Sequence, residues 1–377
     1  MSVLSRLRSQ PSRSTTAELC PDTALRVLLI CDWFFAYCAA QAVGLSTSGA
    51  SVMVVCRDHL AEFAGSRAEW DHHLARMIDA GVAVSVVRGR VRSRSALYSG
   101  VRAWSAARRW RPDIAHAHPN HDPWLLLVSG NSPLVVTVHD AVPHPGQPML
   151  GMFKAALDRL WLRRADGIVV HGEQIEAVCR ARGLDVPIAV IPHGTELAAA
   201  PDPVPRNRDV LFFGRLEPYK GIGVLVEAME EVWRVYPAVR LTVAGRGPAA
   251  TEVPDGDPRI RRIAGYVSDE DRDRLFAEAT LLVAPYLEAS QSGVVSLAVA
   301  RGIPAVVSDA GALPDLAVDP SLVVPVGDAR ALANAVITTL EHGETLRRRV
   351  YDMASERLSW PVVSGLTLAF YRRLRAS

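Results

Sequence analysis

Residues 210–245 read VLFFGRLEPYKGIGVLVEAMEEVWRVYPAVRLTVAG, and this stretch indicates the fold class. Val210–Phe213 and Val239–Ala244 are apolar runs without strict alternation, which predicts strands buried on both faces. Between them, Ile222–Val235 carries apolar residues at helical spacing and predicts an amphipathic helix. A strand, a crossover helix and a second strand are the repeating pattern of a parallel α/β sheet.

The same pattern extends in both directions along the chain. Downstream strands are predicted at Ile260–Ile263, Leu281–Ala284, Ala305–Val307 and Leu322–Val324. Upstream strands are predicted at Leu25–Cys31, Ser51–Cys56, Val82–Val87, Asp113–Ala115, Leu134–Val138, Ile168–Val170 and Ile188–Ile191. The expected fold is therefore α/β, with two Rossmann-like doubly wound domains that face a cleft.

Domain limits follow from breaks in this pattern. Residues 1–23 are rich in Ser and Arg and lack an apolar segment, so a loose N-terminal tail is expected there. The first domain is expected at 24–196. A linker is expected at 197–208, where prolines replace the periodic pattern. The second domain is expected at 209–361. A last helix, 362–377, is expected to cross back to the first domain.

Composition excludes several classes of protein. The 377 residues are 49% hydrophobic and 22% charged with a net charge of +2, so no nucleic-acid partner is expected. The 5 cysteines form no CxxC pair, which favours reduced thiols in the cytoplasm. No apolar run approaches the ~20 residues of a membrane span.

The first candidate site lies in FFGRLEPYKG, residues 212–221. Gly214 ends the predicted strand, Arg215 follows, and Lys220 immediately precedes the predicted helix. Lys154 and Lys220 are the two lysines of this arginine-rich chain. Two cations and a helix N-terminus at one strand end suit a diphosphate. Alone, the pattern also fits two surface cations on a loop.

The second candidate site follows the strand Leu281–Ala284. Glu288 comes first, and Ser292 and Gly293 then begin a helix whose N–H groups suit an anion. A carboxylate before an anion site fits a sugar phosphate, with Glu288 accepting hydrogen bonds from hydroxyls. The alternative is an ordinary acidic residue in a first helical turn.

An ordered set of motifs resembles the retaining glycosyltransferases of the GT-B fold, family four. The resemblance covers about residues 25 to 375. In the second half it rests on FFGRLEPYKG, LTVAGRGP, IAGYVSDEDRDRLFAEATLLVAPY and the segment around Glu288. In the first half it rests on DIAHAH, VVTVHD, ADGIVVHGE and IAVIPHGTE.

The resemblance implies a set of site residues. Arg215 and Lys220 would contact the donor diphosphate and stabilise the leaving group, while Glu288 would bind sugar hydroxyls. His139 would lie near the sugar, and His139 and Asp140 are the nearest candidates for a general base. The implied donor-binding residues are Gly214, Gly245, Gly247, Tyr266, Val267, Ser292, Gly293, Val294 and Ser296.

Two departures from the family pattern bear on activity. Ser296 stands where the second Glu of the family motif holds the ribose hydroxyls, a role that a serine fills only in part. Asp32–Tyr37 stands where the family usually carries a Gly-Gly pair. This aromatic cluster puts a close backbone approach to the donor phosphate in doubt and fits an acceptor site equally well.

The implied function is transfer of a sugar, with retention, from a nucleoside diphosphate sugar to an acceptor hydroxyl. The resemblance implies no cofactor and no essential metal. Two alternatives stay open: a nucleotide-sugar epimerase on the same fold, and a non-catalytic sugar-nucleotide binding protein. The nucleobase, sugar and acceptor are not indicated by the sequence.

Two further clusters need an interpretation. His116, His118 and His121 are spaced closely enough for a metal, but a strand-end loop is the simpler interpretation. Residues 88–111 carry eight arginines, with Leu97, Val101 and Trp104 on one helical face. The simplest interpretation is a helix that packs this apolar stripe on its own sheet. The alternative is peripheral contact with anionic lipid at the inner membrane face, or attraction of an acidic acceptor.

Overall fold

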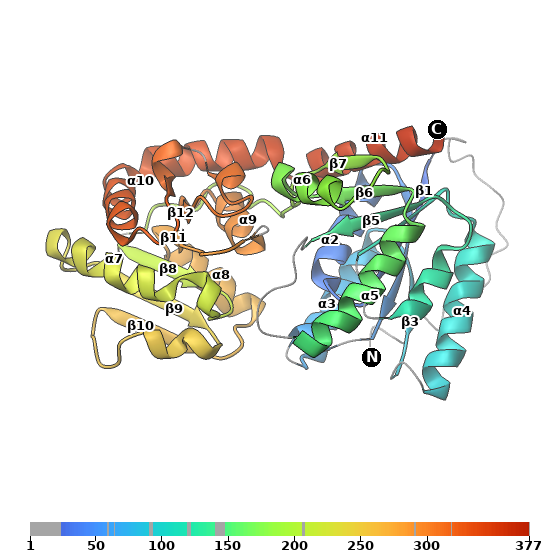
Figure 1. Ribbon diagram of the computed structural model, residues 1–377, viewed down its shortest axis with the longest axis horizontal. Helices are drawn as coiled ribbons and strands as arrows, with labels where there is room; N and C mark the ends of the chain where they lie inside the picture. Colours follow the sequence, from blue (N-terminus) through green and yellow to red (C-terminus); the bar gives the residue numbers. More distant parts are fainter. Residues whose placement is uncertain are drawn as a thin grey trace. The chain divides into compact units, whose positions relative to one another are not determined.

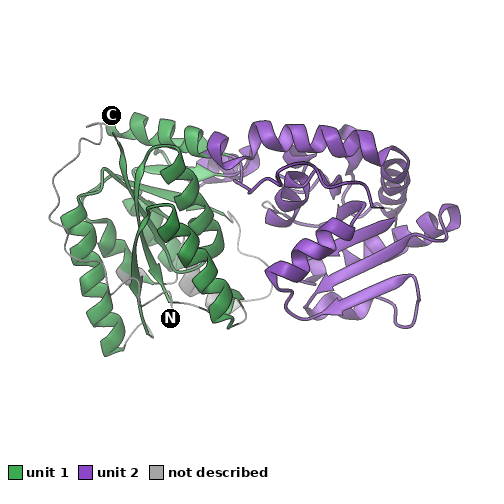
Figure 2. Cartoon of the chain, turned by 180° about the vertical axis from the view of Figure 1, so that it is seen from behind, with its two compact units in different colours: residues 1–170, 183–191, 364–377 green, residues 171–182, 192–363 purple. Residues whose placement is uncertain are grey.

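The computed structural model describes residues 24–58, 60–63, 65–89, 93–118, 122–139, 148–205, 208–289, 292–317 and 319–376. Within these ranges the chain forms two compact units, each built on one parallel sheet (Figures 1 and 2). The first unit holds the described residues up to Val170, with 183–191 and 364–376; the second holds 171–182 and 192–363. The expected tail, 1–23, lies outside the described residues.

The first sheet has seven strands in the order β3-β2-β1-β4-β5-β6-β7. They are β1 (Arg26–Cys31), β2 (Ser51–Arg57), β3 (Ala83–Val87), β4 (Ile114–Ala117), β5 (Leu134–Val138), β6 (Gly167–Val170) and β7 (Ile188–Val190). Ile30 pairs in parallel with Val55 on one side and with Ala117 on the other, which fixes the register at the centre. The helices of this unit are α2 (Phe35–Thr47), η1 (Ala61–Phe63), α3 (Arg67–Asp79), α4 (Arg94–Trp110), η2 (Pro123–Ser129) and α5 (Pro148–Arg164).

The second sheet has six strands in the order β10-β9-β8-β11-β12-β13. They are β8 (Asp209–Phe213), β9 (Arg240–Gly245), β10 (Ile260–Ala264), β11 (Leu281–Ala284), β12 (Ala305–Ser308) and β13 (Val323–Val324). Its helices are α6 (Glu173–Ala181), η3 (Pro218–Lys220), α7 (Ile222–Val235), η4 (Pro248–Glu252), α8 (Asp269–Glu278), α9 (Gly293–Ala300), η5 (Pro314–Leu316), η6 (Pro320–Leu322) and α10 (Ala329–Arg357). Helix α11 (Trp360–Ala376) ends the described chain.

The predicted α/β fold with two doubly wound sheets is confirmed. In each sheet the first strand of the unit lies beside the second on one side and the fourth on the other. The chain therefore reverses its direction of winding between β1 and β4, and again between β8 and β11. Ligands of such sheets bind outside the carboxyl ends of the strands at this switch point.

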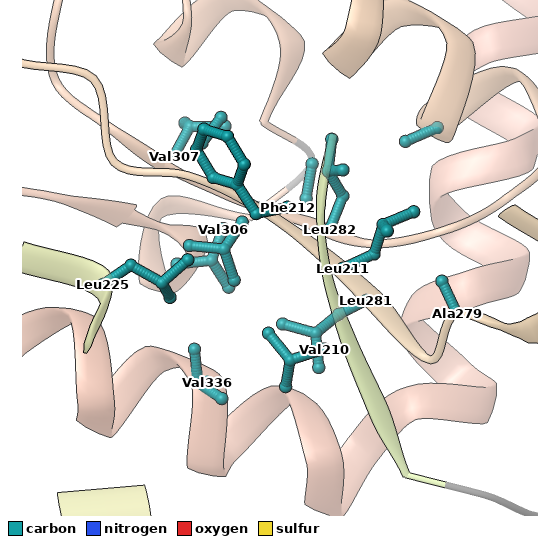
Figure 3. Close-up of a cluster of buried hydrophobic side chains, with 14 of the residues drawn as sticks. Val210, Leu211, Phe212, Leu225, Ala279, Leu281, Leu282, Val306, Val307 and Val336 are labelled. Atoms are coloured by element: carbon teal, nitrogen blue, oxygen red, sulfur yellow. The ribbon is translucent and has the colours of Figure 1, made fainter. Parts of the chain in front are cut away.

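The core of the second unit shows why the central strands read as continuous apolar runs. Val210 and Leu211 of β8 and Leu281 and Leu282 of β11 are each no more than 1% exposed. Leu225 of α7 lies in the same cluster of side chains (Figure 3). Helices cover both faces of the sheet, so the strands have no polar face to display.

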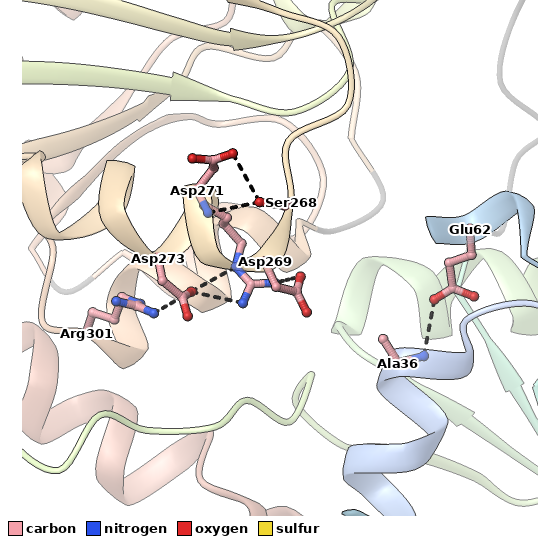
Figure 4. A network of polar contacts seen from close by, with 8 residues as sticks. Ala36, Glu62, Ser268, Asp269, Asp271, Asp273 and Arg301 are labelled. Carbon is pink, nitrogen blue, oxygen red and sulfur yellow. Dashed lines mark hydrogen bonds and ion pairs between the residues drawn. The ribbon is translucent and has the colours of Figure 1, made fainter. Parts of the chain in front are cut away.

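Polar contacts fix helix starts in both units (Figure 4). In the second unit Ser268 caps α8 by accepting a hydrogen bond from the N–H of Asp271 at 3.1 Å, and Asp273 of α8 accepts one from Arg301 at 2.7 Å. In the first unit the Glu62 carboxylate accepts from the N–H groups of Phe35 and Ala36 at 2.8 and 3.2 Å. It thereby satisfies donors that the first turn of α2 leaves without a helical partner.

The expected linker is partly attached to the second unit. Ala198 donates to the carbonyl of Ala300 and Asp202 to that of Arg301, at 3.4 and 3.1 Å, and Tyr351 of α10 donates to the carbonyl of Ala198 at 2.8 Å. Residues 171–182 and 192–196 also group with this unit although they precede the linker. The domain limits stay predictions.

The end of α11 groups with the first unit from residue 364. A Cβ atom on Gly167 of β6 would come within 2.6 Å of Leu374 and 3.0 Å of Phe370, so glycine there allows α11 to lie close to the sheet. The predicted crossing of this helix between domains stays a prediction.

Candidate functional site

The predicted donor-site residues gather at the carboxyl edge of the second sheet. Arg215 and Lys220 follow β8, and Glu288 follows β11, the strand paired beside it at the switch point. The two loops contact each other, since the N–H of Leu287 donates to the carbonyl of Tyr219 at 2.7 Å. Sheet pairing thus brings together residues that lie about 70 positions apart in the sequence.

Lys220 lies over the ring of Tyr286. Its Nζ is 3.6 Å from the ring centroid, and the ring itself is 1% exposed. Burial raises the pKa of Tyr286 to about 12, although a hydrogen bond with Ser292 lowers it in part. The phenol is therefore neutral at physiological pH, and its face holds the ammonium group without neutralising the charge. The ring of Tyr286 therefore adds no negative charge beside Lys220.

Arg215 is exposed on the loop that Gly214 begins. Its Nη2 lies 3.4 Å from the hydroxyl of Tyr219, which belongs to the same loop. An exposed guanidinium with one long hydrogen bond to a neutral group keeps most of its donors directed to solvent. Arg215 and Lys220 thus place two cations on one loop after β8.

Two glycines let the loops after β8 and β9 meet backbone to backbone. Gly245 has φ 143° and Gly247 has φ 153°, a region that residues with a Cβ rarely adopt. A Cβ on Gly245 would overlap the carbonyl oxygen of Gly214, and one on Gly247 would overlap that of Leu216. Both glycines also line a cavity of about 250 Å³ with Leu216, Arg246, Ala250, Val253 and Arg262 among its other walls.

Helix α9 begins at the same edge of the sheet. Ser292, 4% exposed, is its N-cap and accepts a hydrogen bond from the N–H of Val295 at 3.3 Å. Gly293 is exposed and Val294 half-buried in the first turn, where N–H groups have no helical acceptor. The start of α9 therefore offers backbone donors and the positive end of its dipole to an anion.

The side chain of Ser296 bonds to the backbone of its own helix, α9. The residue is 1% exposed, and its hydroxyl donates to the carbonyl of Ser292 at 3.2 Å. This local bond competes with any outward hydrogen bond of the side chain. At the position of the family's second Glu, this chain carries a buried hydroxyl that is already bonded.

The remaining predicted donor residues lie on the surface of the second unit. Glu288 is exposed in the turn after β11. Tyr266 is 42% exposed in the loop after β10, whereas Val267 beside it packs against the hydrophobic core. An exposed aromatic ring next to an anchored residue offers a surface on which a planar group stacks.

His139 belongs to the first unit, directly after β5. It is 4% exposed, and its ring stacks on Phe34 with centroids 4.4 Å apart. Phe34 has φ 59°, a left-handed conformation uncommon for a bulky residue. Tyr37 meets the ring of His139 edge-on at 5.7 Å. The aromatic residues that replace the family's Gly-Gly pair therefore pack around His139. Asp140 lies outside the described residues.

Two of the closely spaced histidines, His116 and His118, hydrogen-bond to side chains. His116 contacts the hydroxyl of Thr137 at 2.6 Å and that of Tyr371 at 2.5 Å. Across the described ranges no group of three or more His, Cys, Asp or Glu side chains is arranged to hold a metal ion. His121 lies outside those ranges.

Helix α4 contradicts the simplest interpretation of its stripe. Leu97, Tyr98, Val101 and Trp104 are 69, 67, 55 and 42% exposed. The buried residues of α4 are Ala96, Ala103 and Ala107, and the helix packs against β3 and η2. The prediction that the apolar stripe packs on its own sheet is therefore wrong. No helix among the described residues is long and apolar enough to cross a membrane.

Sequence reasoning missed several residues around these sites. Tyr286 ends the apolar run LLVAPY, and its position after a strand was the available signal. His193 lies beside α9, because a Cβ on Gly293 would be 3.7 Å from its ring. Gln41 hydrogen-bonds to His118 at 2.8 Å from the middle of α2, where nothing local distinguishes it.

Two doubly wound units, with paired cations and glycine loops at one switch point, define the GT-B class of glycosyltransferase fold. The Glycosyltransferase Family 4 pattern matches residues 36–199, and the Glycosyl transferases group 1 pattern matches residues 207–342. A phosphatidyl-myo-inositol mannosyltransferase from Mycolicibacterium smegmatis is 31% identical over 304 residues, 75% of this chain and 76% of that protein. The chain belongs to the group 1 glycosyltransferases, family 4.

Other similar proteins agree with this class. A glycogen synthase from Mycobacterium tuberculosis is 28% identical over 70% of this chain and 69% of its own. The fold matches sucrose-phosphate synthase from Thermosynechococcus elongatus with a TM-score of 0.65 and 21% identity, covering 93% of this chain and 99% of that one. It also matches Anabaena Alr3699/HepE in complex with UDP, with a TM-score of 0.66 and 17% identity, covering 93% and 100%.

Proposed function

We propose that this glycosyltransferase moves a hexose from a nucleoside diphosphate sugar to an acceptor hydroxyl, with retention of anomeric configuration. The observation that carries the proposal is the grouping of Lys220, Arg215 and the start of α9 at one sheet edge. Cations and free backbone donors at one edge suit a diphosphate. Structures of the similar Anabaena protein hold UDP and UDP-glucose, which supports a nucleotide-sugar donor.

In this proposal the protein contributes position and charge. Lys220 and Arg215 stabilise the negative charge that develops on the departing diphosphate. Glu288 accepts hydrogen bonds from sugar hydroxyls, and His139 orients the donor sugar. The acceptor oxygen bonds to the anomeric carbon on the face from which the diphosphate leaves, so no side chain acts as a nucleophile. The departing phosphate takes the acceptor proton, so no side chain is needed as the general base. The reaction needs no cofactor and no metal, and EDTA leaves its rate unchanged.

Nucleotide binding is the first test. UDP, GDP and ADP are compared at about 1 mM by thermal shift. A ligand at ~100 times its Kd adds about 2.7 kcal/mol of stability. One nucleotide raises Tm by a few degrees, Lys220→Ala abolishes the shift, and Arg234→Ala retains it, because Arg234 lies exposed on α7 in an ion pair with Glu231. No shift with any of the three counts against the donor site.

Turnover separates the proposal from its alternatives. A transferase consumes the donor only with an acceptor, such as a mixed lipid extract. An epimerase converts the donor without an acceptor, and a binding protein converts nothing. Lys220→Ala and Glu288→Ala each remove most transfer while the fold is retained. Near-normal transfer in both variants refutes the assigned site.

We also propose that the acceptor is presented at a membrane and that the protein works in the cytoplasm, on the inner membrane face. Leu97, Val101 and Trp104 expose an apolar surface. The guanidinium of Arg102 lies 5.8 Å from the ring centroid of the exposed Tyr98 on the same helix. The guanidinium of Arg108 lies 5.4 Å from the Trp104 ring centroid. An apolar strip bordered by arginines suits an interface rich in anionic lipid. The mannosyltransferase relatives are named for a lipid acceptor, which supports this proposal. Flotation with anionic vesicles, compared with zwitterionic vesicles, tests it.

A further inference from the structure

We propose that Gln41 and His118 are positioning residues that fix the tautomer of His139, so that Nδ1 of His139 presents a lone pair. The hydrogen-bond chain stands on the geometry of the first unit alone. Its effect on sugar transfer rests on the function proposed above.

The hydrogen-bond chain joins three elements of the first unit. His118 follows β4 and His139 follows β5, and these strands pair in parallel, so the two rings meet at one sheet edge. Nδ1 of His118 is 3.1 Å from Nε2 of His139. Nε2 of His118 is 2.8 Å from Oε1 of Gln41, which lies on α2. Gln41, His118 and His139 are 4, 0 and 4% exposed.

The direction of these hydrogen bonds follows from what each atom can do. The amide oxygen of Gln41 only accepts, so Nε2 of His118 carries a proton. Burial favours the neutral form of both rings, because a charged ring would lose its hydration. A neutral His118 then has a bare Nδ1 that accepts from Nε2–H of His139. His139 therefore has its proton on Nε2 and a lone pair on Nδ1.

The tautomer of His139 depends on every hydrogen bond between Gln41 and His139. Rotating the Gln41 amide by half a turn would direct its NH₂ group at His118 and reverse both hydrogen bonds. His139 would then carry its proton on Nδ1. In the observed orientation Nδ1 of His139 is able to accept a hydrogen bond, such as one from a sugar hydroxyl; in the reversed orientation it is able only to donate. The orientation of an amide on α2 thus selects the hydrogen-bonding role of His139.

Packing holds the rings of His118 and His139 in place for these hydrogen bonds. Phe34 stacks on His139 at 4.4 Å, and His116 stacks on His118 at 5.2 Å. Tyr37 meets both imidazoles edge-on, at 5.6 Å from His118 and 5.7 Å from His139. With the rings held in place, these two hydrogen bonds determine which nitrogen of His139 carries the proton.

The test replaces the acceptor at the start of the chain. Gln41→Met removes the amide with little change in shape. The full chain is labelled with ¹⁵N-histidine, and the ring signals of His139 are assigned with His139→Asn. We expect the Nε2–H tautomer of His139 in the wild type, and a mixture of tautomers in Gln41→Met. We expect kcat to fall about 10- to 100-fold in Gln41→Met, the usual cost of losing a residue that orients a functional histidine, with the donor KM little changed.

Thr339→Val is the matched control. Thr339 lies in α10 of the second unit, is fully buried and donates its hydroxyl to the carbonyl of Ala335 at 2.7 Å, so this variant loses a buried hydrogen bond that involves neither His118 nor His139. We expect its His139 signals to match the wild type.

Two NMR results overturn the proposal: a proton on Nδ1 of His139 in the wild type, or an unchanged tautomer in Gln41→Met. Wild-type kcat in a Gln41→Met enzyme whose tautomer has changed overturns the positioning role. If the tautomers respond as expected but the wild type turns over no nucleotide sugar, the proposed function fails and the hydrogen-bond chain stands.

Discussion

Helices α4 and α7 are both amphipathic, but they turn opposite kinds of residue toward their sheets. Helix α7 buries its large apolar residues, Ile222, Leu225, Met229, Val232 and Trp233. Helix α4 buries alanines and exposes Leu97, Tyr98, Val101 and Trp104. Helical periodicity therefore locates an apolar face without showing what covers it. An alanine face approaches a sheet closely, which leaves the large residues free for another surface.

The largest effect is expected in the core beneath α7. Leu225→Ala removes a fully buried side chain from the second unit and should lower the free energy of unfolding by about 2–5 kcal/mol. Urea denaturation measures the loss. A cost below about 1 kcal/mol would contradict the contrast between the helices, because α7 would then contribute no more packing than α4.

The arginines of α4 should contribute to lipid binding and not to the stability of the fold. Changing Arg102, Arg108 and Arg109 to Glu should weaken binding to anionic vesicles by about 3 kcal/mol or more, at about 1 kcal/mol per arginine near the surface. Flotation measures the change. The control variant changes Arg234, Arg274 and Arg349 to Glu. Their side chains are 70, 60 and 52% exposed in the second unit, and this variant should bind anionic vesicles as the wild type does. Wild-type protein that never floats refutes membrane docking.

A smaller loss is expected where α4 meets its sheet. Ala103 is fully buried, so Ala103→Leu inserts a side chain into a closely packed contact and should cost about 1–3 kcal/mol. Ala106→Leu is the matched change on the same helix, at a half-buried position, and should cost less. Equal unfolding midpoints for the two variants would show that alanines do not form the packed face.

The smallest effect is expected on the exposed stripe. Val101→Ser should change the unfolding free energy by no more than about 0.5 kcal/mol, because the side chain is 55% exposed. The same variant should reduce vesicle binding, because it removes an apolar contact with the interface. A clear loss of stability would mean that the stripe is covered in solution.

The sequence predicts the sheets well because buried parallel strands are continuous apolar runs. Leu134–Val138 and Leu281–Ala284 have the same bounds in the sequence analysis and in the structure. The spacing of apolar residues predicts a helix over Ala329–Leu340, and in the structure α10 extends beyond it to Arg357. The backbone of α10 departs from helical geometry at His342, and the helix then resumes. Gly343 follows directly, and glycine at such a position is typical of the end of a helix.

The candidate site was predictable only where the chemistry is local. Lys220 stands out because lysine is rare in this chain. Tyr286 beneath it is 66 residues away and is placed by the pairing of β8 with β11, which no local pattern specifies. The contact between His118 and His139 likewise depends on which strands become neighbours. The face of α4 that meets the sheet depends on side-chain size.

The pairing of Lys220 with the Tyr286 ring also makes this protein well suited to covalent footprinting. With Lys154 and Lys220 as its two lysines, the chain offers few primary amines to an acylating reagent, apart from its α-amine. Lys220 is half-buried, so its rate of acylation reports directly on what lies above the ring. Mass spectrometry of a single tryptic region then follows occupancy of the proposed donor site, without an assay and before any acceptor is known.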